Sequence, residues 1–210
     1  MASAVGTAVL TTAYAATLAT GLLSLQSPQT PIGDPLFSIL EILIILTMPL
    51  MVALMAAVHA WASAETKVFS LIAVVFTSLL AGLTCSVHFV ILTVGRQAPF
   101  SGNAWMSLFL SFKWPSVAYA LDILAWDVFF ALSVLAAAPA FTGTRLTMSI
   151  RVLLVASGAL ALAGLSGVIV GDIQLRNIGI VGYAGVFPVA ALLIAVLFGR
   201  TTPREETAAR

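Results

Sequence analysis

The sequence predicts an all-α membrane protein built as a polytopic helical bundle. Its 210 residues are 61% hydrophobic and only 8% charged, which is more apolar than one water-soluble core of this size can bury. The mean hydropathy is +1.12, and the uncharged stretches match the roughly 20 apolar residues that a helix needs to cross a bilayer. These three observations exclude an ordinary soluble domain.

Six stretches are long and apolar enough to be transmembrane helices. The first lacks the basic residues of a secretory signal, so we interpret it as a retained span. The second begins after a proline-rich loop at 26–35, and the fourth begins at Pro115, a residue typical of a first helical turn. The predicted spans are 2–25, 36–62, 68–94, 115–139, 152–170 and 178–198. They form a single transmembrane domain, 1–200, followed by a charged cytoplasmic tail, 201–210.

Basic residues gather at one end of the predicted bundle. Six crossings put both termini at that end, named side B, and the opposite end is named side A. Side B collects six basic residues and side A three: Lys67, Arg145, Arg151, Arg200, Arg204 and Arg210 against Arg96, Lys113 and Arg176. The positive-inside rule therefore predicts cytoplasmic termini, and we expect a bacterial plasma membrane. The net charge of +1 gives no indication of a nucleic-acid partner.

Ionisable side chains inside the spans are the first candidates for function, because such groups cost several kcal/mol in a membrane unless they are paired. Five are present: Glu41, His59, His88, Asp122 and Asp127. At about 1.5 Å per residue, all except His59 fall in the side A half of the bilayer. His59 lies near side B beside Trp61, where an interfacial role is the better interpretation. The other four form either a catalytic cluster or a packing cluster, in which Glu41 or Asp122 is bonded to His88 or to hydroxyls such as that of Thr84.

The fourth span combines an acid with aromatic residues. Tyr119, Asp122, Trp126 and Phe129 are three, four and three residues apart, so they share one helical face. Asp127 follows Asp122 by five residues, about 140° around an ideal helix. We therefore expect the two acids to face different neighbours.

The side A connector before the fourth span predicts a short seventh helix. Trp105, Leu108, Phe109 and Phe112 recur at i, i+3, i+4 and i+7, a pattern typical of an amphipathic helix lying in the membrane interface. Two interpretations stay open for this segment. It is an aromatic membrane anchor, or it is a lid above the acid cluster.

An acid in an aromatic chamber is suited to Brønsted-acid chemistry. A carboxyl in a low-dielectric site favours its neutral form and can donate a proton, while aromatic faces stabilise nearby cations. We expect Asp122 to be the donor with Glu41 as its partner or alternative, and His88 or a second carboxylate such as Asp127 to be the terminating base. We expect no cofactor and no metal, since the single Cys85 excludes a multi-cysteine site.

A resemblance to a known family rests on the overall size, on Glu41 in the second span and on the stretch from Tyr119 to Asp127. The sequence resembles small integral-membrane terpene cyclases of fungal and bacterial meroterpenoid and indole-terpenoid pathways. This resemblance implies a compact helical protein in which carboxyls on separate helices protonate an isoprenoid epoxide or alkene. The substrate would then be a hydrophobic isoprenoid-type molecule reached from the lipid bilayer. The aromatic residues assigned to its binding are Tyr119, Trp126, Phe129, Trp105, Phe109 and Phe112.

Two other classes of function remain open. Acids and a histidine in one half of a bundle also suit a proton-coupled transporter or proton relay. A non-catalytic subunit of a membrane complex is the third class, with Ala159, Ala163, Gly167 and Gly171 as a small-residue docking ridge. The polar turn at 172–177 is better explained as a solvated loop than as a substrate contact. The sequence predicts no oligomeric state.

Overall fold

The fold is a bundle of six long apolar helices, seen in a computed structural model that describes residues 1–25, 27, 30–97 and 104–200. The described residues contain no strand, which confirms the predicted fold class. The predicted tail, 201–210, and the connector residues 98–103 lie outside the described residues. All six helices have the length and hydropathy to cross a membrane.

The first three crossings are long helices with few interruptions. A proline, Pro49, lies inside the second of them without ending it. Their elements are α1 (Ala2–Leu23), α2 (Leu36–Trp61), and η1 (Ala64–Thr66), α3 (Lys67–Thr93) and η2 (Val94–Arg96). The predicted seventh helix is α4 (Ala104–Leu110), which is too short to cross and ends before Phe112.

The last three crossings are segmented. The fourth comprises α5 (Val117–Ile123), the π-helical η4 (Leu124–Phe130), α6 (Ala131–Ala137) and η5 (Ala138–Ala140). The fifth comprises α7 (Arg145–Gly164) and α8 (Ser166–Val170). The sixth comprises η6 (Ile173–Arg176), α9 (Asn177–Ile180), the π-helical η7 (Val181–Val186) and α10 (Phe187–Arg200). The fifth crossing begins with a capping box, in which the Thr144 and Thr147 side chains each accept from the other's backbone N–H.

Helix α2 packs between α1 and α3, while α3 packs in turn against η4 and α6. On the other side of the bundle, α7 contacts α6, α9, η7 and α10. The core holds large apolar side chains with less than 2% exposure, among them Met48, Leu54, Phe130, Phe141 and Phe187. The outer surface keeps exposed apolar residues such as Phe69 and Val75, as a surface in contact with lipid requires.

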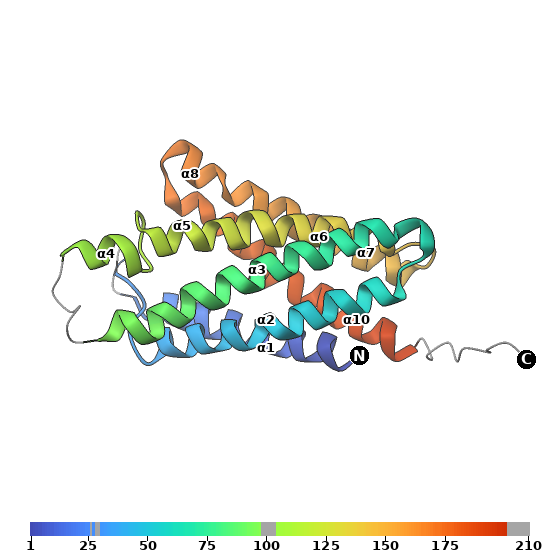
Figure 1. The fold of residues 1–210 in the computed structure, drawn as a ribbon, viewed down its shortest axis with the longest axis horizontal. Helices are drawn as coiled ribbons and strands as arrows, with labels where there is room; N and C mark the ends of the chain where they lie inside the picture. The colour runs from blue at the N-terminus through green and yellow to red at the C-terminus, as the bar shows by residue number, and fades with distance from the viewer. Residues whose placement is uncertain (26, 28–29, 98–103, 201–210) are drawn as a thin grey trace, which may run out of the picture.

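The two termini of the bundle lie at the same end, as the sequence predicts (Figure 1). Helix α1 begins and α10 ends at the same end of the bundle, where the α2–α3 connection also lies (Figure 1). Helix α4 lies at the opposite end, which corresponds to side A (Figure 1). A left-handed glycine, Gly171 at φ 81°, ends α8 at side A and turns the chain back into η6.

The small-residue ridge predicted on the fifth crossing lies mostly on the outer surface of the bundle, so its role as a docking face stays a prediction. Of its four members only Gly167 is buried, whereas Ala159, Ala163 and Gly171 are exposed. The glycines that admit a neighbour are Gly158 and Gly164, which are buried on another face of α7. A Cβ added at Gly158 would lie 2.6 Å from Leu135 Cγ, so close packing with the fourth crossing requires glycine there.

We predict that Gly182→Ala destabilises the bundle. A Cβ at this position would lie 2.6 Å from the Ser157 carbonyl oxygen, and that contact is backbone and cannot rotate away. Overpacking of this kind costs about 1–3 kcal/mol, so the thermal midpoint of the purified protein in detergent should fall. Gly185→Ala in the same π-helix is the matched control, since its Cβ would meet only Val181 Cγ1 at 3.9 Å. Equal midpoints for the two variants would contradict this packing.

Candidate functional site

A chain of five ionisable side chains lies buried near side A. Each comes from a different element: Glu41 from α2, His88 from α3, Asp122 from α5, Asp127 from η4 and Arg176 from η6. All are 6% exposed or less. Four of the five were expected from the sequence to gather here, and the fifth, Arg176, was not.

His88 stands between two carboxyls. Its Nδ1 lies 2.8 Å from Glu41 Oε2 in a buried hydrogen bond, which joins α3 to α2. Its Nε2 lies 3.5 Å from Asp122 Oδ1 on α5, an ion-pair distance without hydrogen-bond geometry. The imidazole therefore bonds firmly to Glu41 and faces Asp122 more loosely.

Arg176 binds the other two carboxyls. Its Nη2 donates to Asp122 Oδ2 at 2.7 Å and its Nε donates to Asp127 Oδ2 at 2.9 Å. The guanidinium carbon lies 4.8 Å from the centre of the Tyr119 ring, in cation–π contact. The expectation that 172–177 is a solvated loop is thus wrong for Arg176, whose side chain is 4% exposed. Its charge is balanced by the acids of the fourth crossing.

The π-helical turn in η4 explains why one arginine can reach both acids. On an ideal α-helix, Asp122 and Asp127 would point about 140° apart, and we expected different neighbours for them. In a π-helix the hydrogen bonds run from i to i+5. Each residue therefore adds a smaller rotation about the helix axis than in an α-helix, and side chains five residues apart point in more similar directions. Both acids therefore face Arg176, and the expectation is wrong.

The cluster holds more acids than bases. Three carboxyls face one guanidinium and one imidazole. With every group ionised the net charge is negative by one, and a buried net charge is costly. Asp122 and Asp127 each already accept a hydrogen bond from Arg176, whereas the partner of Glu41 is the titratable His88. The hydrogen bond between Glu41 and His88 holds one proton, which this sum already counts as the charge of the imidazole.

Some buried polar atoms of the described residues have no hydrogen-bond partner. Within the described part of the chain, they include His88 Nε2, Asp127 Oδ1 and Thr84 Oγ1. The Thr84 contact named in the packing interpretation is therefore absent, whereas the Glu41–His88 contact that it also named is present. Asp127 Oδ1 lies against close-packed glycines: a Cβ at Gly179 would be 2.6 Å from it.

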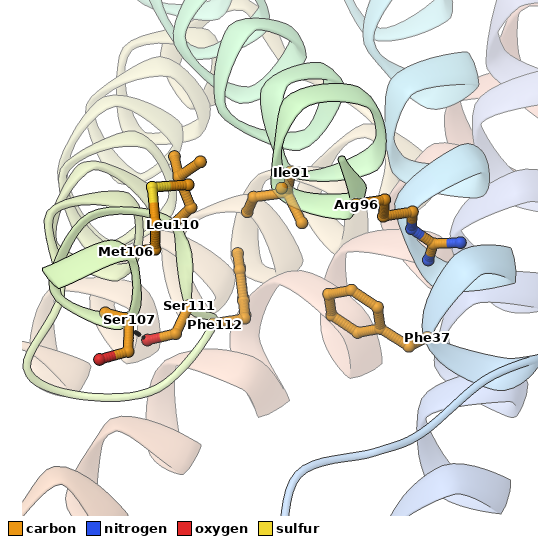
Figure 2. Close-up of a pocket in the computed structure, with 9 residues that line it drawn as sticks. Phe37, Ile91, Arg96, Met106, Ser107, Leu110, Ser111 and Phe112 are labelled. Carbon is orange, nitrogen blue, oxygen red and sulfur yellow. Dashed lines mark hydrogen bonds between the residues drawn. The ribbon is translucent and has the colours of Figure 1, made fainter. Parts of the chain in front are cut away.

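A pocket of about 310 Å³ opens beside the cluster, between α2, the end of α3 and α4. Figure 2 shows Met106 and Leu110 on the α4 side, Ile91 and Phe112 in the middle, and Arg96 at the opposite edge. Phe112 also contacts His88, with ring centres 5.3 Å apart. Phe112 is thus the wall shared by the pocket and the Glu41–His88 pair.

The six aromatic residues predicted to bind a substrate lie in different places. Phe112 lines the pocket, and Tyr119 packs edge-on against it at 5.5 Å. Trp126 packs instead against Tyr183 of η7, and Phe129 packs against Phe76 of α3. The remaining two, Trp105 and Phe109 on α4, are about half exposed and contact each other. Of the six, Phe112 and Tyr119 adjoin the cluster.

His59 takes part in a separate contact near side B. Its Nδ1 lies 2.9 Å from Ser70 Oγ, and Lys67 Nζ donates to the His59 carbonyl at 2.6 Å. Lys67 therefore caps the end of α2, a favourable place for a cation. In the described part of the chain, no group of three or more His, Cys, Asp or Glu is placed to hold a metal ion.

Arg176 is the functional residue that the sequence analysis missed. Its neighbours along the chain, Asp172, Gln174 and Asn177, have the composition of a surface turn. The available signal was charge balance, because three acids buried in one half of a membrane require a cation nearby. Arg176 lies on side A and was available for that role.

Comparisons with protein-family models, with curated proteins and with solved structures find no match for this chain.

We predict that Arg176→Gln strongly destabilises the protein, because it leaves the Asp122 and Asp127 carboxylates buried without their cation. Breaking a buried pair from one side costs about 3–5 kcal/mol. The thermal midpoint in detergent measures this loss. Arg145→Gln, at an exposed position in the first turn of α7, is the matched control and should change little.

The double variant Arg176→Gln/Asp127→Asn removes one charge of each sign and should recover part of the lost stability. A single variant as stable as Arg145→Gln, or a double variant less stable than the single one, would contradict the role of Arg176 as counter-ion.

Proposed function

We propose that this protein is a membrane-embedded Brønsted-acid cyclase or isomerase acting on a long apolar, isoprenoid-type substrate. The observation that carries this proposal is the buried Glu41–His88 hydrogen bond of 2.8 Å behind the aromatic wall of a pocket. Such a pair holds a proton in a site shielded from water, which acid initiation of a cyclisation requires. The resemblance to small membrane terpene cyclases points in the same direction.

The proton donor in this proposal is the Glu41–His88 pair. Asp122, the donor first expected, is held at 2.7 Å by Arg176 and so is better suited to stay a carboxylate. From there it stabilises a positive charge on His88, whose Nε2 is 3.5 Å away. Asp122 would thus act as a positioning residue for the imidazole. Asp127 and Arg176 would complete the charge balance.

The aromatic side chains next to the pair suit a cationic intermediate. Phe112 lies 5.3 Å from the His88 ring, and Tyr119 lies 5.5 Å from Phe112. Protonation of an epoxide oxygen or an alkene by the pair leaves a carbocation in the substrate, which aromatic faces stabilise. Loss of a proton from the cyclised cation back to the pair returns it to its starting state.

A proton relay is the second candidate, favoured by the continuity of the chain from Glu41 to Asp127. Transfer across the membrane also needs polar groups toward side B. There, the core contacts are hydroxyl bonds such as Thr77 to Ser133, and among the acidic and histidine side chains of the described spans the next one is His59 near the end of α2. The confinement of the acids to side A supports one-sided chemistry over transport.

We also propose that both termini lie in the cytoplasm. The end of the bundle that carries α1's start and α10's end also holds Lys67, Arg145, Arg151 and Arg200. This supports the orientation by the positive-inside rule. The pocket and the acid cluster would then open toward the outer leaflet.

Glu41→Gln should leave the fold intact and lower turnover of an epoxidised isoprenoid by at least about a hundredfold, since general acids contribute on this scale. Product formation in membranes, followed by gas chromatography with mass spectrometry, measures it. Glu65→Gln is the matched control, because Glu65 is exposed in η1. Elution at the wild-type volume on size-exclusion chromatography checks the fold of both variants.

Two outcomes would contradict the proposed function. Turnover by Glu41→Gln at the rate of Glu65→Gln would remove the pair as the acid. A proton flux in liposomes that depends on Glu41, without product formation, would favour the relay instead.

A further inference from the structure

The pocket beside the cluster has two chemically different ends. Its wall is mostly apolar, with Phe37, Ile91, Met106, Leu110 and Phe112. At the edge away from α4 stands a cation, Arg96, the last residue of η2 (Figure 2). In Figure 2 the Arg96 side chain extends from η2 away from the apolar residues, and its guanidinium bonds to Ser38 at the start of α2. A ligand that extends past this edge of the pocket therefore meets the guanidinium.

Arg96 retains donors for a ligand. Its hydrogen bonds to Asp34 Oδ1 at 3.3 Å and to Ser38 Oγ at 2.7 Å both use Nη2. Nε and Nη1 make no hydrogen bond to the described residues. The side chain is 40% exposed, and that of Asp34 is 57% exposed, so this ion pair contributes little to stability and exchanges readily.

Asp34 competes for the same guanidinium. The hydrogen bond that it accepts from the Ser38 hydroxyl lowers the pKa of Asp34 below its usual value, and Arg96 acts in the same direction. Asp34 is therefore an anion at neutral pH, already seated on Arg96. An incoming anion of higher charge, or one anchored by an apolar tail, can replace it.

The pocket lies at the level of lipid headgroups. Arg96 ends the span Ala64–Arg96 at side A, and neighbouring α4 keeps Trp105 53% exposed, as is typical of an aromatic residue at a membrane interface. A molecule that enters here from the bilayer arrives with its head near Arg96 and its tail among apolar side chains.

We infer that this pocket binds an anionic amphiphile, with a phosphate or carboxylate head on Arg96 and an apolar chain against Ile91, Leu110 and Phe112. Binding of this ligand does not depend on the proposed function. Its role as the substrate does rest on the proposed function. In that role the middle of the ligand's chain lies against Phe112, 5.3 Å from the His88 ring, so the reacting double bond or epoxide lies between the head and the far end of the chain.

The same head chemistry is available from two sources. One is a membrane phospholipid such as phosphatidylglycerol, and the other is a free prenyl phosphate. Binding to the full-length protein in phosphatidylcholine nanodiscs tests both, with farnesyl monophosphate, farnesol and inorganic phosphate as probes and microscale thermophoresis as readout. A second set of nanodiscs contains phosphatidylglycerol. Weaker farnesyl monophosphate binding in these discs identifies the phospholipid as a competing occupant of the same site.

We expect farnesyl monophosphate to bind at least about tenfold more tightly than farnesol, because a charge-assisted hydrogen bond to Arg96 contributes a gain in affinity of this size. Inorganic phosphate alone should bind far more weakly than farnesyl monophosphate. Arg96→Gln should remove the preference for the phosphate, and Asp34→Asn should tighten farnesyl monophosphate binding because the competing carboxylate is gone. Leu110→Trp, which fills the apolar end, should weaken both chain-bearing probes.

Equal affinity for farnesol and farnesyl monophosphate in the wild type, or an unchanged preference in Arg96→Gln, would overturn the inference. So would farnesyl monophosphate binding that Leu110→Trp leaves intact. Glu41→Gln separates the two proposals, since it should bind the probe as the wild type does while turnover is lost. If the wild-type protein binds the probe as expected but shows no turnover, the proposed function is contradicted and the binding inference is not.

Discussion

The ion pairs of Arg176 with Asp122 and Asp127 are the interaction on which the rest of the site depends. They bring one cation into a half-membrane that holds three acids, and without it the acids could not share a dry interior. The chain makes room for this cation with small residues. A Cβ at Gly167 would lie 2.9 Å from the Arg176 backbone nitrogen, so α8 and η6 can turn tightly and deliver the guanidinium inward.

Once Arg176 has bound two carboxylates, the remaining acid and the imidazole are left to each other. Glu41 and His88 therefore share a proton in their hydrogen bond, while Asp122 lies beside the second ring nitrogen of His88. The proton is then next to Phe112 and the pocket, at the end of the bundle where α4 lies. Under the proposed function, a site of this kind acts on molecules that come from one side of the membrane.

Hydropathy and helix rise were sufficient to predict the six spans and the gathering of Glu41, His88 and Asp122 near one face, because depth in a membrane follows from position along a straight helix. The direction in which each side chain points around its helix axis was less predictable. The π-helical η4 rotates Asp127 toward Asp122, and the end of α4 at Leu110 separates Phe112 from Trp105. Burial of Arg176 depends on contacts with α5 and η4, which no local pattern encodes.

Phe112 gains its position from the irregular backbone after α4. The Ser116 hydroxyl donates to the Ser111 carbonyl at 2.5 Å, and the Ser111 hydroxyl donates to the Ser107 carbonyl at 2.6 Å. These bonds satisfy carbonyls that the short helix leaves open and turn the chain so that the ring faces His88. Under the proposed function, a ligand in the pocket and the acid pair meet at one side chain, because Phe112 both lines the pocket and contacts His88.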